Sequence, residues 1–165
     1  MPVCSRDHGA TATMIKQDQH WVSRAEDCFA NAKPAHFTDF RHCCECAEHD
    51  ETLRTNDRET IGLAELGNPG WDPLCFCTGE GLLYYMPAMI RLSLQTLDKE
   101  FYFSQLLFHL EYDGEKNRLL TACTAGQRSL VEDFLYYMID CHADRLEKFA
   151  ELDNTLRVAE LWSGD

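Results

Sequence analysis

The sequence predicts a mainly α-helical protein, a small single-domain helical bundle with at most a short β-hairpin or extended segment. Apolar residues recur at helical spacing along most of the chain, and residues that cap helices precede these segments. Only residues 74–77 form a short apolar stretch with the length of a strand. The chain has 165 residues, 45% of them hydrophobic, which is enough for a core that needs no cross-links.

The N-terminal part of the chain is expected to differ from the rest. Residues 1–18 show no hydrophobic periodicity, so we expect a loose N-terminal lead there and one helical domain over residues 19–165. The first helix of that domain is expected over residues 20–32, where apolar residues recur on one face. Pro34 would follow its end, because proline cannot continue the helical hydrogen-bond pattern.

A second helix is expected over residues 38–55. Thr38 is a favourable N-cap residue, and Asp39 would place a negative charge in the first turn, where it suits the helix dipole. At about 100° per residue, one face of this helix is mostly apolar and is expected to pack on the core. On that face Cys44 would be a small buried side chain beside Phe37, Phe40 and Ala47.

The middle of the chain carries a constrained turn and a long apolar helix. Prolines and glycines surround Trp71 in the segment 67–73, so this tryptophan is expected either to cap the core or to present a recognition surface. Thr78 is expected to cap the next helix, and Pro87 to kink or restart it.

The C-terminal part gives the clearest helix prediction. Thr124 and Gln127 have the spacing of a capping box, in which each side chain binds a backbone N–H group of the other residue. Apolar residues then recur at helical spacing as far as Phe149. A last apolar set over residues 152–162 predicts a final short helix.

The charge of the chain excludes some partners. There are 28 acidic and 15 basic residues, a formal net charge of −13, which repels phosphate groups. We therefore expect no nucleic-acid binding and no attachment to a membrane, but attraction of a basic protein partner or a cation. The longest apolar run, residues 82–90, is too short for a membrane span, and no secretory signal is recognisable, so we expect a cytoplasmic protein.

The stretch RHCCECAEHD, residues 41–50, contains the most suggestive group of side chains. His42, Cys46 and His49 follow one another at i, i+4 and i+7, which places them on one side of the expected helix. Cys43 adds a CxxC pair with Cys46. Zinc binds imidazole and thiolate groups and takes four ligands in a structural site. The sequence therefore predicts a zinc site on these four residues.

Additional ligands are expected from the same side of the helix and from a second segment. Asp50 falls on the same side as Cys43 and Cys46. Cys75 and Cys77 would point to one side of an extended segment, because side chains at i and i+2 share a face. The two thiols are therefore candidates to complete a four-sulfur set with the CxxC pair, although the separation of the two pairs is unusual.

Other interpretations of the stretch remain open. The pair His49–Asp50 is also found in all-helical metal-dependent phosphohydrolases, which suggests a small hydrolase with His42, His49 and Asp50 as ligands. A redox role for Cys43 and Cys46 lacks the strand that precedes CxxC in thioredoxin-like proteins. The stretch is also compatible with a polar helix that binds no metal.

Four segments of the chain resemble those of an uncharacterised bacterial family, a domain of unknown function. They are HFTDFRHCCECAEHDETLR, ELGNPGWDPLCF, GLLYYMPAMIRLSL and GQRSLVEDFLYYMID. The resemblance spans residues 21–146 and implies that the Cys/His stretch and the turn at Trp71 belong to one domain. It implies no activity.

The functional expectation therefore comes from the residues alone. The chain has no P-loop, no dinucleotide-binding glycine pattern and no G-x-S-x-G motif. We expect a non-enzymatic binding or interaction protein with a structural zinc site between Cys43 and Asp50. The alternative is the small metal-dependent hydrolase.

Overall fold

The structure of the protein, a computed structural model, describes residues 10–164, with side chains from residue 16 onward. The described residues form eight α-helices and three short 3-10 helices, with no strand among them. The α-helices are α1 (Ala10–Cys28), α2 (Cys44–Thr55), α3 (Leu63–Leu66), α4 (Gly79–Gln95), α5 (Phe103–Glu111), α6 (Arg118–Ala122), α7 (Ala125–Lys148) and α8 (Leu152–Ser163). The 3-10 helices are η1 (Pro69–Trp71), η2 (Pro73–Phe76) and η3 (Gly114–Lys116). The predicted mainly α-helical fold is confirmed.

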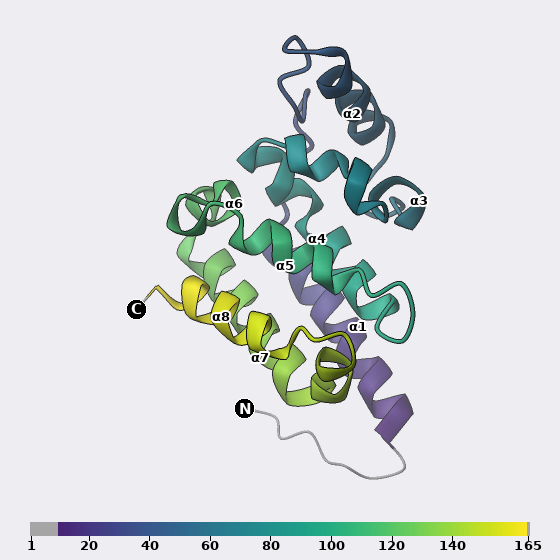
Figure 1. Ribbon diagram of the computed structural model, residues 1–165, viewed down its shortest axis with the longest axis vertical. Coiled ribbons are helices and arrows are strands. Elements are labelled where there is room, and N and C mark those ends of the chain that lie inside the picture. The colour runs from purple at the N-terminus through teal and green to yellow at the C-terminus, as the bar shows by residue number, and fades with distance from the viewer. Residues whose placement is uncertain (1–9, 165) are drawn as a thin grey trace.

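Helix α4 lies at the centre of the molecule (Figure 1). It packs against α1, α5 and α6, while α7 packs against α1 and α8. Helices α2 and α3 occupy one end of the molecule, and α7 and α8 lie toward the other. The 3-10 helix η2 contacts both α2 and α3, so it joins this end to the rest.

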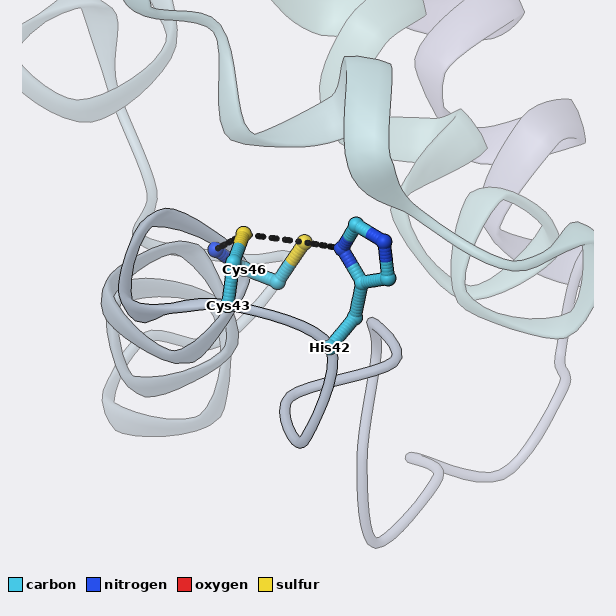
Figure 2. A group of neighbouring side chains, drawn as sticks. All are labelled: His42, Cys43 and Cys46. Atoms are coloured by element: carbon cyan, nitrogen blue, oxygen red, sulfur yellow. Dashed lines mark hydrogen bonds between the residues drawn. The ribbon is translucent and has the colours of Figure 1, made fainter.

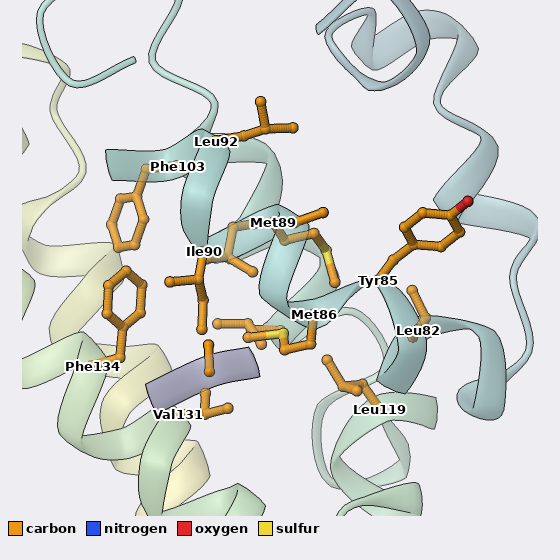
Figure 3. Packing of buried hydrophobic residues seen from close by; sticks show 14 of the residues in the cluster. Leu82, Tyr85, Met86, Met89, Ile90, Leu92, Phe103, Leu119, Val131 and Phe134 are labelled. Carbon is orange, nitrogen blue, oxygen red and sulfur yellow. The ribbon is translucent and has the colours of Figure 1, made fainter. Parts of the chain in front are cut away.

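The core is built around α4 because this helix is apolar on all sides. Every residue from 81 to 90 is buried, which is typical of a helix that packs between other elements. Figure 3 shows Met86 and Ile90 among side chains from other helices, including Phe103, Val131 and Phe134. Nearly all of the buried apolar residues in the described part of the chain form one hydrophobic cluster, as expected for a single domain.

Two helix starts agree with the sequence predictions. The Thr78 side chain accepts a hydrogen bond from the Gly81 N–H group at 3.1 Å, so it caps α4 as expected. Thr124 and Gln127 form the predicted capping box at the start of α7, with bonds of 3.2 and 3.0 Å. Helix α4 continues through Pro87, so the expected restart does not occur.

The expected N-terminal lead over residues 1–18 needs correction. Helix α1 begins at Ala10, and residues 1–9 lie outside the described residues. The Asp18 carboxylate accepts a hydrogen bond from the Tyr137 hydroxyl at 2.6 Å and contacts His142 Nε2 at 3.0 Å. These polar contacts join the middle of α1 to α7, which hydrophobic periodicity does not reveal.

Two other expectations about local structure were wrong. The second helix begins at Cys44 and not at Thr38, because the residues before it fold back along the helix as a loop. The segment Leu74–Cys77, expected to be extended, lies largely in the 3-10 helix η2. Asp72 caps η2 by accepting a hydrogen bond from the Leu74 N–H group at 2.9 Å, which starts a turn where apolarity alone suggests a strand.

Between residues 10 and 164 there is no helix with the length and apolar character of a membrane span.

Candidate metal centre

A buried carboxylate shapes the loop that leads into α2. Asp50 Oδ1 accepts hydrogen bonds from the N–H groups of Phe37 and Thr38, at 2.6 and 3.1 Å. Its other oxygen, Oδ2, lies 2.7 Å from His36 Nδ1. The Thr38 hydroxyl donates to the Cys46 carbonyl oxygen at 2.7 Å. These bonds hold the loop over residues 36–43 against α2, so Asp50 has a structural role.

The same contacts explain the acidity of Asp50. Burial alone would raise the pKa of this carboxyl group, but the hydrogen bonds from His36, Phe37 and Thr38 outweigh burial and lower the pKa. The group is therefore charged under ordinary conditions and able to accept all three bonds. Asp50 is only 2% exposed, and its oxygens do not belong to the group of candidate ligand atoms around His42 that lie within 4.8 Å of one another.

The loop brings three of the predicted metal ligands together at the start of α2 (Figure 2). The sulfur atoms of Cys43 and Cys46 lie 3.3 Å apart, and His42 Nδ1 lies 3.8 Å from Cys46 Sγ. All three ligand atoms lie within 4.8 Å of one another. The sequence thus predicted a group that the fold brings together, although His42 and Cys43 precede the helix and do not lie on its surface.

Cys43 occupies the N-cap position of α2, and this position makes its thiol acidic. Its sulfur accepts a hydrogen bond from the Cys46 N–H group at 3.4 Å. This bond, followed by hydrogen bonds with the Cys46 thiol and with His42, lowers the pKa of Cys43 to about 7. The contact with Cys43 in turn raises the pKa of His42 and of Cys46. Cys43 is therefore the first of the two thiols to ionise.

The acidity of Cys43 gives a testable pH dependence. The thiolate is the form that reacts with iodoacetamide, so the alkylation rate of Cys43 is expected to rise with pH and reach half of its maximum near pH 7. Peptide mapping by mass spectrometry would follow Cys43 separately from the other cysteines. In a Cys46→Ala variant the midpoint should move to higher pH, because the hydrogen bond from the Cys46 thiol is lost and alanine offers no donor in its place. A midpoint near pH 9 in the unaltered protein would contradict the assignment.

His49, the fourth predicted ligand, lies elsewhere. Its side chain is 1% exposed, and its ring packs against the rings of Trp71 and Phe76, each with a centroid distance of 4.6 Å. Its Nε2 atom has no hydrogen-bond partner among the described residues, and the nearest carboxylate oxygen, on Glu45, is 3.8 Å away. His49 does not join the other three ligands. The Trp71 ring packs on this histidine, and Trp71 is 46% exposed. One side of the Trp71 ring is therefore packed, and part of it is accessible to solvent.

The expected burial of Cys44 was wrong. Cys44 is exposed, and the buried face of α2 consists of Cys46, His49, Asp50 and Leu53. The prediction placed Phe37 and Phe40 on the helix and let them define its core face. Both residues belong to the preceding loop, so the buried face of the helix is the one that was expected to bind metal.

The remaining candidate ligands do not complete the site. Cys77 is fully buried in the hydrophobic cluster, where burial raises the pKa of its thiol well above the usual range. Cys75 lies in η2 and belongs to a different group, with Asp72 and His109. No pattern in the sequence pointed to this second group, because His109 is separated from the other two residues by more than thirty positions and its surroundings resemble a core helix.

The His42–Cys43–Cys46 group has the chemistry of a site for a soft or borderline divalent cation. Two thiolates and a neutral imidazole would balance the charge of such an ion, and the nitrogen and sulfur donors match the preference of zinc. Comparison of the chain with protein-family models, with curated proteins and with solved structures found no match.

Proposed function

We propose that this protein binds a divalent transition metal ion, zinc in particular, through His42, Cys43 and Cys46. The observation that carries the proposal is the convergence of one nitrogen and two sulfur atoms within 4.8 Å. A tetrahedron with Zn–S of about 2.3 Å and Zn–N of about 2.0 Å has edges of about 3.5–3.8 Å. The S–S edge of such a tetrahedron is about 3.8 Å and the N–S edge about 3.5 Å, so the observed S–S and N–S distances of 3.3 and 3.8 Å each need a shift of less than about 0.5 Å to hold the ion.

The accessibility of the group favours a binding role over a purely structural one. His42 is exposed and Cys43 is partly exposed, so an ion there would contact solvent. With three protein ligands the fourth position is open to water, to a small ligand or to a side chain of a partner protein. This is the arrangement expected of a protein that exchanges metal or uses it in an interaction. A basic partner for the acidic chain stays a prediction.

Competition with a chromophoric chelator would test the proposal on the full chain. The unaltered protein is expected to bind zinc at this group with an affinity at least about 100-fold greater than that of the Cys46→Ser variant, since a thiolate that would bind the ion directly is lost. The matched control is Cys44→Ser, which changes an exposed cysteine beside the site and is expected to keep the affinity. Equal affinities of the Cys44 and Cys46 variants would contradict the proposal.

A second candidate function is thiol–disulfide exchange by Cys43 and Cys46. The favouring observation is the position of Cys43 at a helix N-terminus, 3.3 Å from the second sulfur. In this reaction the Cys43 thiolate attacks a substrate disulfide, which forms a mixed disulfide and releases the first substrate thiolate; the Cys46 thiolate then attacks the Cys43 sulfur, which forms the Cys43–Cys46 disulfide and releases the second substrate thiolate. Equilibration with glutathione redox buffers, followed by mass spectrometry, would show a reversible Cys43–Cys46 disulfide. Its absence under oxidising conditions would contradict this function.

The geometry does not favour the small hydrolase with His42, His49 and Asp50 as ligands. Neither Asp50 nor His49 belongs to the group of ligand atoms around His42 that lie within 4.8 Å of one another, and other contacts hold both side chains in place. A shared ion would require both side chains to leave these contacts.

A further inference from the structure

A second cluster of ionisable side chains lies between η2 and α5. Asp72 Oδ2 and His109 Nε2 are 2.7 Å apart, and both side chains are at most 3% exposed. Gln105 donates a further hydrogen bond to Asp72 Oδ2 at 3.1 Å. The carboxylate and the imidazole are therefore held in fixed positions in the interior.

Cys75 adds a third ligand type to this pair. Its sulfur, a carboxylate oxygen of Asp72 and a ring nitrogen of His109 all lie within 4.8 Å of one another. Arg118 Nη2 donates to the Cys75 carbonyl oxygen at 2.9 Å, which fixes the end of η2 near the cluster. Burial, followed by the charge of Asp72, raises the pKa of Cys75 to about 11, so this thiol is a poor nucleophile by itself. A cation would be needed to stabilise its thiolate.

The cluster borders a cavity of about 210 Å³. Cys75 and His109 line it together with Leu82, Phe108, Tyr112 and Arg118. Asp72 is not among the lining residues, but it is hydrogen-bonded to His109, which is one of them. Two of the three candidate ligands therefore face a space large enough for an ion with a bound water or small anion.

A buried hydroxyl group without a partner lies near the same cluster. Tyr102 is 1% exposed, and its hydroxyl group forms no hydrogen bond among the described residues. Burial raises the pKa of Tyr102, and the nearby Asp72 and Cys75 raise it further. Buried polar atoms are rarely left unpaired, so an additional bound group is expected at this place.

We infer that Asp72, Cys75 and His109 form a second metal site, independent of the first, with its open coordination position toward the cavity. A carboxylate, a thiolate and a neutral imidazole would balance a divalent ion, which a buried site requires. The ion would replace the proton shared by Asp72 and His109 and the proton of the Cys75 thiol. Three ligands of types N, O and S suit zinc or cobalt, and the fourth position would hold water or a small anion.

Cobalt(II) substitution tests this site without reliance on any activity. The full-length protein would be stripped of metal and titrated with cobalt in a Cys43→Ser/Cys46→Ser background, which removes the thiolates of the first site. We expect one bound equivalent and a sulfur-to-cobalt charge-transfer band in the near ultraviolet. Adding Cys75→Ser should abolish that band, while Cys28→Ser, a change at another half-buried cysteine, should leave it unchanged.

The outcomes separate this proposal from the first. No charge-transfer band in the double variant, or a band that persists after Cys75→Ser, would overturn the second site while the first could still stand. Two equivalents in the unaltered protein, one of them lost with Cys43 and Cys46, would support both. Far-UV circular dichroism would verify folding, and Cys75→Ala provides a second variant if Cys75→Ser does not fold. Azide would bind at the open coordination position and should shift the visible cobalt bands. An unchanged spectrum would contradict the inference that this coordination position is open.

Discussion

Replacement of Asp50 by alanine is expected to lower the free energy of unfolding by about 3 kcal/mol, because it leaves two buried backbone N–H groups without acceptors. Asp50 also carries the contact that holds His36 in the loop. Once these bonds are lost, the loop over residues 36–43 should no longer place His42 and Cys43 beside Cys46. We therefore expect a loss of zinc affinity along with the loss of stability.

Urea unfolding and zinc competition would be measured on the same variants. Glu51→Ala changes the next carboxylate, which is exposed, and is expected to alter the free energy of unfolding by less than about 0.5 kcal/mol. The free energy of unfolding of Asp50→Asn should lie between those of Asp50→Ala and Glu51→Ala, since an amide keeps one acceptor oxygen. Equal stability of the Asp50→Ala and Glu51→Ala variants would contradict the role assigned to Asp50.

The stabilisation by Asp50 also has a defined pH dependence. The folded-state pKa lies below the unfolded value of about 3.9, so the folded protein favours the charged form. The contribution is fully present above the unfolded pKa and is lost as the pH falls through the folded pKa. The stability difference between the unaltered protein and Asp50→Ala should accordingly shrink in acid.

Replacement of Phe134 by alanine is expected to cost about 4 kcal/mol of folding free energy, since it opens a large cavity in the core. Phe134 on α7 is fully buried, and its ring lies 5.6 Å from that of Trp21 on α1 and 6.3 Å from that of Phe103 on α5. The side chain therefore contacts both α1 and α5, and Figure 3 shows its ring facing that of Phe103.

Tyr136 provides the matched control for this variant. It lies on the same helix and is 39% exposed, so Tyr136→Ala should cost at most about 1 kcal/mol. Urea denaturation with an unchanged slope would confirm that the difference lies in the folded state. A Phe134→Ala protein as stable as Tyr136→Ala would show that the core does not depend on this ring.

The parts of the fold that could be predicted are those set by local chemistry. The start of α7 follows from Thr124 and Gln127, which bind each other's backbone within one turn. The start of α4 follows from Thr78 for the same reason. The contacts of Asp18 in α1 with α7 join residues more than a hundred positions apart in the sequence, so no local pattern predicts them.

In the candidate metal centre, too, the features set by neighbouring residues could be predicted, and those set by contacts between distant segments could not. Cys43 and Cys46 are three residues apart, so a turn of backbone is enough to bring them together, and His42 is adjacent. The exclusion of His49 depends on Trp71 and Phe76, whose rings enclose it from another segment. The face of α2 was misassigned because Phe37 and Phe40 lie outside the helix, a boundary set by the long-range bonds of Asp50.

The Asp50 hydrogen bonds have one more consequence, for the way in which the protein would gain and lose metal. In a zinc finger the ion itself orders the chain, so removal of the metal unfolds the domain. Here a carboxylate orders the loop, and the candidate ligands are held close together by the protein alone. Binding would then require little ordering of the chain, and release would leave an intact receptor ready for the next ion. Such preorganisation suits rapid, reversible exchange better than permanent storage.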